Sequence, residues 1–180
     1  MAFWNQSSAA PKRNYRFRVL IQGMNGGSVI WWAKGFKTPS YEVSETAHDY
    51  LDNKYYFPGR LTWNDCSMTL VDPISPVNAV QETNDIIINS GYQVKGSEAY
   101  NTISRNGAHS ALGSVTIDII DAEGNSVELW TLKNAFIKSV AFSDLAYDND
   151  ELRTIDITFR YDWATCSSDA GATEQFSTTS

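Results

Sequence analysis

The sequence predicts a mainly β domain, a two-sheet antiparallel β-barrel or sandwich flanked by one α-helix. Most segments alternate apolar and polar side chains, which is the period of a half-buried strand. Clusters of Gly, Asn and Asp separate these segments, as turns do between strands. The 180 residues, of which 42% are hydrophobic, suffice for one domain with a sizeable core.

The first third of the chain predicts a hairpin, a long loop and a strand. The segments NYRFRVLIQ (14–22) and SVIWWAKGFK (28–37) flank the turn residues GMNGG and are expected to pair. Residues 39–57 are polar and aromatic, and we interpret them as a long loop, a feature that is often functional in compact domains. The segment RLTWNDCSMTLVD (60–72) is expected to form the next strand.

One segment, SPVNAVQETNDIIINSGY, has a helical period. Ser75 is a natural N-cap, Pro76 suits the first turn, and Gly91 is a natural end. We therefore expect one helix over about residues 76–90, followed by a loop over 95–113.

The remaining chain predicts strands within 114–122, 126–132, 135–147 and 151–164. The last has the clearest alternation of the chain, with one apolar and one polar face. The apolar face holds Ile155, Ile157, Phe159, Tyr161 and Trp163, and the polar face holds Thr154, Asp156, Thr158, Arg160 and Asp162. We expect one domain over 14–163, between a flexible N-terminal arm (1–13) and a polar C-terminal tail (164–180).

The charge of the chain is negative and unevenly distributed. A net charge of −7 argues against a protein dedicated to the nucleic-acid backbone, which needs a basic face. Residues 1–60 carry eight basic and four acidic side chains, whereas the other 120 residues carry six basic and seventeen acidic ones. This asymmetry suggests surfaces of opposite sign that orient association, unless the fold mixes the two parts.

The residue types that carry catalysis or bind metals do not form a recognisable set. His48 and His109 lack regularly spaced Cys, Asp or Glu partners, and Cys66 and Cys166 lie far apart and are expected to be reduced. We therefore expect no enzyme activity, no metal and no cofactor. No apolar segment is typical of a signal peptide or a membrane span, so we expect synthesis in a cytoplasm and no membrane segment.

The aromatic residues around Pro58 and Gly59 leave three interpretations open. Tyr50, Tyr55, Tyr56 and Trp63, with Arg60 beside them, suit stacking against sugars or single-stranded nucleic acid. They equally suit anchors of a protein interface, where Tyr, Trp and Arg dominate. The negative charge disfavours nucleic acid, and the residues alone do not separate sugar from protein.

The order of these features resembles the tail tube protein family of contractile-tailed bacteriophages. The resemblance spans about residues 14–163 and is carried by two segments, FPGRLTWNDCSMTLVDP and LWTLKNAFIKSVAFSDLAYDNDELRTIDITFRYDW. It implies a two-sheet β-barrel with a helix, hexameric rings, and a hollow tube inside a contractile sheath. Type VI secretion tubes and contractile-bacteriocin tubes share this fold.

The resemblance also implies partners and a location. The partners would be further copies of the chain, the tail sheath protein, and baseplate and terminator proteins, with genomic DNA passing through the lumen unbound. The location would be the virion tail, after synthesis in the host bacterial cytoplasm. A baseplate tube-initiator ring and a secretion or bacteriocin tube are alternatives, and a carbohydrate-binding β-sandwich is a more distant one.

Two groups of residues follow as candidate sites. We expect subunit or ring contacts from the loop region, through Tyr41, His48, Tyr50, Tyr55, Tyr56 and Arg60. We expect the polar face of the last strand, Thr154, Asp156, Thr158, Arg160 and Asp162, to lie on or near the lumen. A polar, net-negative wall lets DNA slide, because it offers no basic surface for phosphates.

Overall fold

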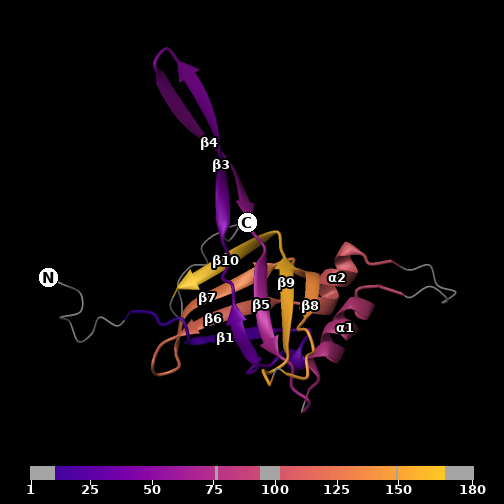
Figure 1. Cartoon of the computed structure of the whole chain (residues 1–180). Coiled ribbons are helices and arrows are strands. Elements are labelled where there is room, and N and C mark those ends of the chain that lie inside the picture. The colour runs from indigo at the N-terminus through magenta and orange to yellow at the C-terminus, as the bar shows by residue number, and fades with distance from the viewer. Residues whose placement is uncertain (1–10, 76, 94–101, 149, 169–180) are drawn as a thin grey trace.

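Two four-stranded antiparallel sheets and one projecting two-stranded hairpin make up the β structure in the computed structural model, which describes residues 11–75, 77–93, 102–148 and 150–168 (Figure 1). Sheet A has the order β1 (Phe17–Ile21), β6 (Val115–Ile120), β7 (Ser126–Lys133) and β10 (Trp163–Ser168). Sheet B has the order β2 (Ala33–Phe36), β5 (Cys66–Val71), β9 (Thr154–Arg160) and β8 (Phe136–Phe142). The prediction of a mainly β, two-sheet antiparallel fold is confirmed, in the form of a sandwich.

The core lies between the two sheets and follows the predicted alternation. In β9, Ile155, Ile157 and Phe159 are fully buried, and the ring of Phe159 stacks on Phe36 of β2 at 6.3 Å. Each such apolar side chain contributes roughly 1.5–3 kcal/mol when it is removed from water.

The predicted N-terminal hairpin is wrong, because β1 and β2 lie in different sheets. An isolated bridge joins Leu20 of β1 to Val29, which lies before β2. Ile30 and Trp32 are both buried, so the chain crosses the core here instead of returning along β1. Burying the side chains of Ile30 and Trp32 favours this path over further β-pairing with β1.

The helix prediction needs two corrections. The helix α1 (Ala79–Asn89) begins three residues later than expected, because Asn78 is the N-cap and its side chain accepts a hydrogen bond from the Gln81 backbone N–H at 3.0 Å. A second helix, α2 (Arg105–Leu112), forms within the loop expected over 95–113, of which residues 95–101 lie outside the described residues. Both helices lie beside sheet B (Figure 1).

Helix α2 is stabilised by its surroundings more than by its own sequence. Ser104 is its N-cap, and Ala108 and Leu112 on its inner face are buried. A Cβ at Gly107 would come within 2.7 Å of the Ser90 carbonyl oxygen, so this glycine permits close packing on the end of α1. Glycine is a poor helix former, which is why the sequence suggests a loop.

The expected long loop over 39–57 is wrong as well. Its residues form β3 (Tyr41–Tyr50) and the first five residues of β4 (Asn53–Trp63), and the two strands pair with each other. The expected strand over 60–72 is divided at Asn64 and Asp65, with its first part in β4 and its second in β5.

The C-terminal strand also ends differently from the prediction. Strand β9 stops at Arg160, and Trp163 begins β10 with 38% of its surface exposed, so Trp163 does not share the buried face of Ile155. Because β10 pairs with β7 as far as Ser168, the sheet continues five residues past the expected domain end at 163. Residues 1–10 of the expected arm and 169–180 of the expected tail lie outside the described residues. Within the described ranges, no helix combines the length and apolarity that crossing a membrane requires.

Candidate assembly surface

A β-hairpin, Tyr41–Trp63, projects far beyond the sandwich, and we call it the arm (Figure 1). Its strands β3 and β4 pair with each other and, over the part of the chain described, with no third strand. Every residue of β3 and β4 except Trp63 is exposed. An isolated two-stranded hairpin is marginally stable in water, so the exposed arm is a candidate for contact with a partner.

The arm exposes large apolar side chains. Tyr50, Tyr55, Tyr56 and Phe57 each leave more than half of their surface in water, and Leu51 at the tip leaves 85%. A contiguous set of exposed apolar groups of this kind marks an interaction site in a soluble protein.

The register of the hairpin divides these side chains between two faces. His48 lies opposite Tyr55 and Thr46 lies opposite Phe57, and the alternation places Tyr50 on the same side. We call His48, Tyr50, Tyr55 and Phe57 the aromatic face of the arm. Tyr56 lies on the other face with its partner Ala47.

The Pro58-Gly59-Arg60 segment forms a β-bulge within the arm. The register shifts between Val43 and Glu45, and the Ser44 hydroxyl accepts a hydrogen bond from the Arg60 backbone N–H at 2.9 Å. A Cβ at Gly59 would lie 2.3 Å from the Ser44 hydroxyl oxygen, so only glycine fits. Bulges twist and re-aim a strand, so this segment sets the direction of the outer arm.

The root of the arm is fixed to the core by aromatic packing. Trp63 is 7% exposed, and its ring lies 5.2 Å from Tyr41 and 5.9 Å from the buried Tyr161. The Asn64 backbone N–H donates to the Ser40 carbonyl at 2.8 Å and closes the root. The arm is therefore packed against the core at its base, and the rest of its length is exposed.

A charged cluster couples this root to sheet B. Asp65, directly after the arm, accepts hydrogen bonds from Lys138 of β8 at 2.6 Å and from Arg160 of β9 at 2.9 Å. Arg160 also donates to the Trp63 carbonyl at 3.2 Å. The hydrogen bonds from Lys138 and Arg160 hold the pKa of Asp65 below its usual value.

Four of the five residues expected on the lumen lie on one face of β9, and the fifth, Asp162, lies outside the strand. Thr154, Asp156, Thr158 and Arg160 alternate with the buried residues of β9 and lie on the outer face of sheet B. Thr69 of β5 donates a hydrogen bond to Asp156 at 2.5 Å. Asp162 lies beyond the strand and forms an ion pair with Arg105 of α2. The polar face is present, and its orientation toward a lumen stays a prediction.

All six residues expected in subunit contacts lie in the arm. The structure brings His48, Tyr50 and Tyr55 onto the aromatic face, places Tyr56 on the other face, and puts Tyr41 at the root and Arg60 in the bulge. Sequence reasoning missed Leu51, Phe57 and Asp65. The available signal was the pair of aromatic and β-branched segments on either side of Leu51 and Asp52, which is typical of a hairpin.

The described residues hold no cluster of three or more His, Cys, Asp or Glu side chains that could bind a metal ion. Neither cysteine is activated: burial raises the pKa of the Cys66 thiol to about 11 and also raises the pKa of Cys166. Both thiols are unpaired, and they lie on different sheets.

The sequence matches no protein-family model and no curated protein. Its fold does match solved structures over nearly the whole chain. A chain of the PVC sheath/tube terminator, from an extracellular contractile injection system, is 16% identical with a TM-score of 0.65, over 90% of this chain and 100% of that one. A chain of the PVC sheath–tube complex is 17% identical with a TM-score of 0.61, over 94% and 99% of the two chains.

The tube-terminating cap of the anti-feeding prophage is similar to the same degree. It is 19% identical with a TM-score of 0.59, over 94% of this chain and 100% of that one. At such identities the likeness establishes the fold alone. The chain has the fold found in tube, terminator and cap structures of contractile injection systems, which is the fold that the resemblance to tail tube proteins implies.

Proposed function

We propose that the chain is a structural, non-enzymatic subunit of the tube of a contractile tail, assembled as hexameric rings that stack inside a sheath. The observation that carries this function is a tube-type sandwich with a largely unburied hairpin arm. In a monomer the apolar residues of the arm would remain exposed to water. An assembly of stacked rings supplies a neighbouring surface for every arm.

The arm contacts the adjacent ring or subunit. Strand β4 has 11 residues, so the arm is roughly 36 Å long and reaches well onto a neighbour. Its aromatic face supplies the side-chain types that dominate interface energetics. The bulge and the packed root aim the arm, so less conformational entropy is lost on docking.

The outer face of sheet B forms the wall of the lumen in this arrangement. Asp156 and the two threonines of β9 present polar groups there, and Arg160 is neutralised by Asp65. Such a wall offers little attraction to phosphates. In a phage tail it conducts genomic DNA without binding it, and the sheath, baseplate and terminator proteins are the other partners.

A ring that ends the tube is the second candidate function. The likeness to terminator and cap structures favours it, because these share the fold to the same degree as the sheath–tube chain. A terminator forms single rings, whereas a tube subunit continues to stack. The two roles therefore differ in the length of the particles that the pure protein forms.

Electron microscopy of the purified chain tests this function. We expect hollow tubes from the unmodified protein and single rings or monomers from Tyr50→Ala/Tyr55→Ala, since this pair removes two anchors from the aromatic face. Tyr92→Ala is the control, because Tyr92 is 49% exposed and lies outside the arm. Normal tubes from the double variant would show that the aromatic face is not the contact.

A further inference from the structure

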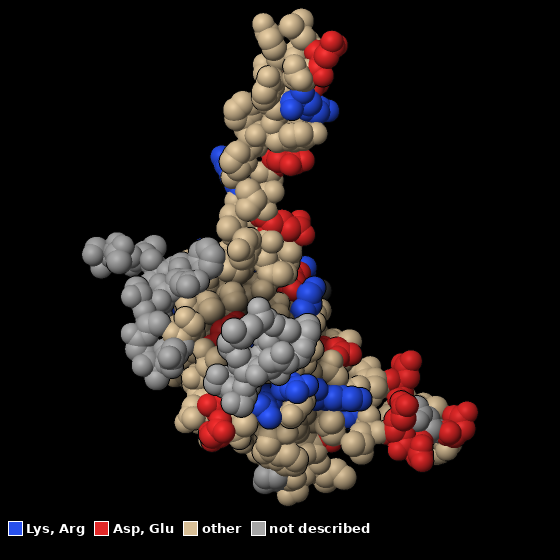
Figure 2. Space-filling view, turned by 90° about the vertical axis from the view of Figure 1, so that its left-hand side faces the viewer, with Lys and Arg blue, Asp and Glu red and all other residues tan. Residues whose placement is uncertain are grey.

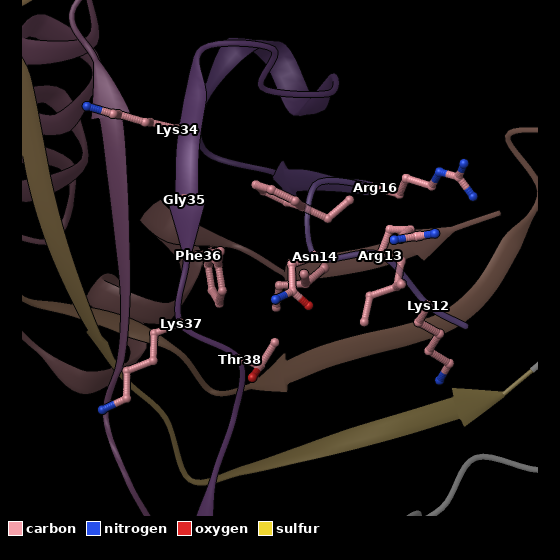
Figure 3. A pocket seen from close by; sticks show the side chains of 12 residues that line it. Lys12, Arg13, Asn14, Arg16, Lys34, Gly35, Phe36, Lys37 and Thr38 are labelled. Carbon is pink, nitrogen blue, oxygen red and sulfur yellow. The ribbon is translucent and has the colours of Figure 1, made fainter. Parts of the chain in front are cut away.

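A groove with basic rims and an apolar floor opens between the edge strands β1 and β2. It has a volume of about 550 Å³. Its floor includes Phe17, Phe36, Ile117 and Ile119, and its basic side chains are Lys12, Arg13, Arg16, Lys34 and Lys37. Figure 3 shows the lysines of the β2 segment on one side and Lys12, Arg13 and Arg16 on the other. We call this the basic groove.

Most cations of the basic groove form no ion pair with another described residue. Arg13, Arg16, Lys34 and Lys37 take part in none of the ion pairs formed by the residues described, and Lys12 alone is paired, with Glu128. No acidic residue is among the described residues that line the groove. In a chain of net charge −7, four cations gathered at one groove without an ion pair in the described structure favour a negatively charged partner from another copy.

A second surface of the chain has the complementary character. The connection from β8 to β9, residues 144–152 and described except for 149, carries Asp144, Asp148 and Asp150, none of which belongs to an ion pair in the described structure. The large apolar residues of this acidic loop are Leu145, 80% exposed, Leu152, 73% exposed, and the fully exposed Tyr147. The loop thus pairs exposed carboxylates with exposed apolar side chains.

The acidic loop does not cover the basic groove of its own chain. It lines a separate hollow with Val71 and Ser143, and of the groove's basic residues only Lys34 borders both. Figure 2 faces the side on which the basic side chains gather, and the acidic cluster projects at its edge, away from that face. Within the described residues, neither surface covers the other.

We propose that the acidic loop of one copy docks in the basic groove of the next copy. Carboxylates meet the basic rims, and Leu145 and Tyr147 reach the apolar floor. The contact joins two unlike surfaces of one chain, so it is heterologous and propagates into a ring or a stack. This inference rests on the proposed function and identifies one contact through which the tube subunits join.

Charge exchange between the two surfaces tests the contact. We expect Arg16→Glu/Lys37→Glu in the groove and Asp148→Lys/Asp150→Lys in the loop each to raise the concentration needed for assembly about tenfold or more, since like charges then meet. Combining all four substitutions restores assembly. Asp85→Lys/Glu123→Lys is the control for the loop variant, because it changes the net charge by the same amount and sign at exposed positions of α1 and the β6–β7 turn.

Mixing the two single-surface variants gives an independent measurement. In the mixture every junction pairs opposite charges: the unchanged loop of the groove variant meets the unchanged groove of the loop variant, and the reversed loop meets the reversed groove. Analytical ultracentrifugation should therefore show assemblies in the mixture at a concentration at which each variant alone stays dissociated. Circular dichroism confirms that each variant is folded. Mixed assemblies that weaken with added salt support an ionic contact.

The outcomes separate this contact from the function on which it rests. If the unmodified chain forms tubes and both charge-reversed variants do so at the same concentration, the loop–groove contact is wrong and the tube function stands. If only the groove variant fails, another acidic partner occupies the groove and the contact is again wrong. A chain that stays monomeric in every form contradicts both.

Discussion

At the scale of single residues, Asp65 determines how the arm is joined to the sandwich. Its carboxylate accepts hydrogen bonds from Lys138 and Arg160, and Arg160 also donates a hydrogen bond to the carbonyl oxygen of Trp63. Because these cations lower the pKa of Asp65, its contribution to stability is present above the ordinary carboxyl pKa of 3.8. The contribution is lost as the pH falls through the lower pKa of the folded state.

Asp65→Asn should therefore reduce the free energy of unfolding at pH 7 by about 1 kcal/mol, a value kept small because Lys138 and Arg160 are partly exposed. Below pH 3.8 the difference from the unmodified chain should shrink as the pH falls, because protonation removes the same charge there. Urea unfolding at pH 7 and at a series of pH values below 3.8 measures this. A difference that is independent of pH would show that the charge of Asp65 is not what stabilises the root.

Gly59 is the second residue on which the arm depends. Gly59→Ala should displace the bulge, since its Cβ would lie 2.3 Å from the Ser44 hydroxyl oxygen and 3.0 Å from the Ser44 carbonyl oxygen. We expect faster amide exchange around residues 43–60 and impaired assembly. Adding Ser44→Ala should rescue only part of the effect, because the carbonyl contact remains. Gly35→Ala is the control for amide exchange only, as its Cβ would meet no atom within 4 Å, whereas Gly35 lines the basic groove and is no control for assembly.

At the scale of elements, the start of helix α1 shows how two possible caps differ. Ser75 and Asn78 are both suitable residue types, and the structure uses Asn78, whose side chain accepts from the Gln81 N–H. Asn78→Ala should cost about 1 kcal/mol of stability, and Ser75→Ala should cost almost nothing. Thermal or urea unfolding of the two variants distinguishes them. Equal losses would mean that the helix begins before Ala79.

The sequence predicts the elements whose pattern is local and misses those that depend on distant partners. The alternation of β9 identifies its buried face because every second residue, Ile155, Ile157 and Phe159, is apolar and is buried in the core. The arm reads as a loop because neither of its faces is buried, so β3 and β4 lack the apolar–polar alternation of a half-buried strand. The sequence of helix α2 is interpreted as a loop because it contains Gly107, and glycine disfavours helices. In the fold, the nearby Ser90 carbonyl oxygen leaves no room for a Cβ at this position, and this contact cannot be predicted from the local sequence.

At the scale of the whole molecule, the chain presents three surfaces that a single subunit leaves unused. These are the aromatic face of the arm, the basic groove and the acidic loop. The uneven charge along the sequence anticipates the last two, since the five basic residues of the groove all precede residue 38 and the loop lies near the C-terminus. Their grouping in space depends on β1 and β2 being edge strands of different sheets, which the sequence does not predict.

A cryo-electron microscopy reconstruction of the particles formed by the unmodified chain tests the central claim most directly. We predict hexameric rings stacked into a hollow tube, in which the arm of each subunit lies against its neighbour and the outer face of β9 lines the lumen. A tube whose arms extend free into solvent, or a protein that forms no rings at high concentration, would contradict the claim.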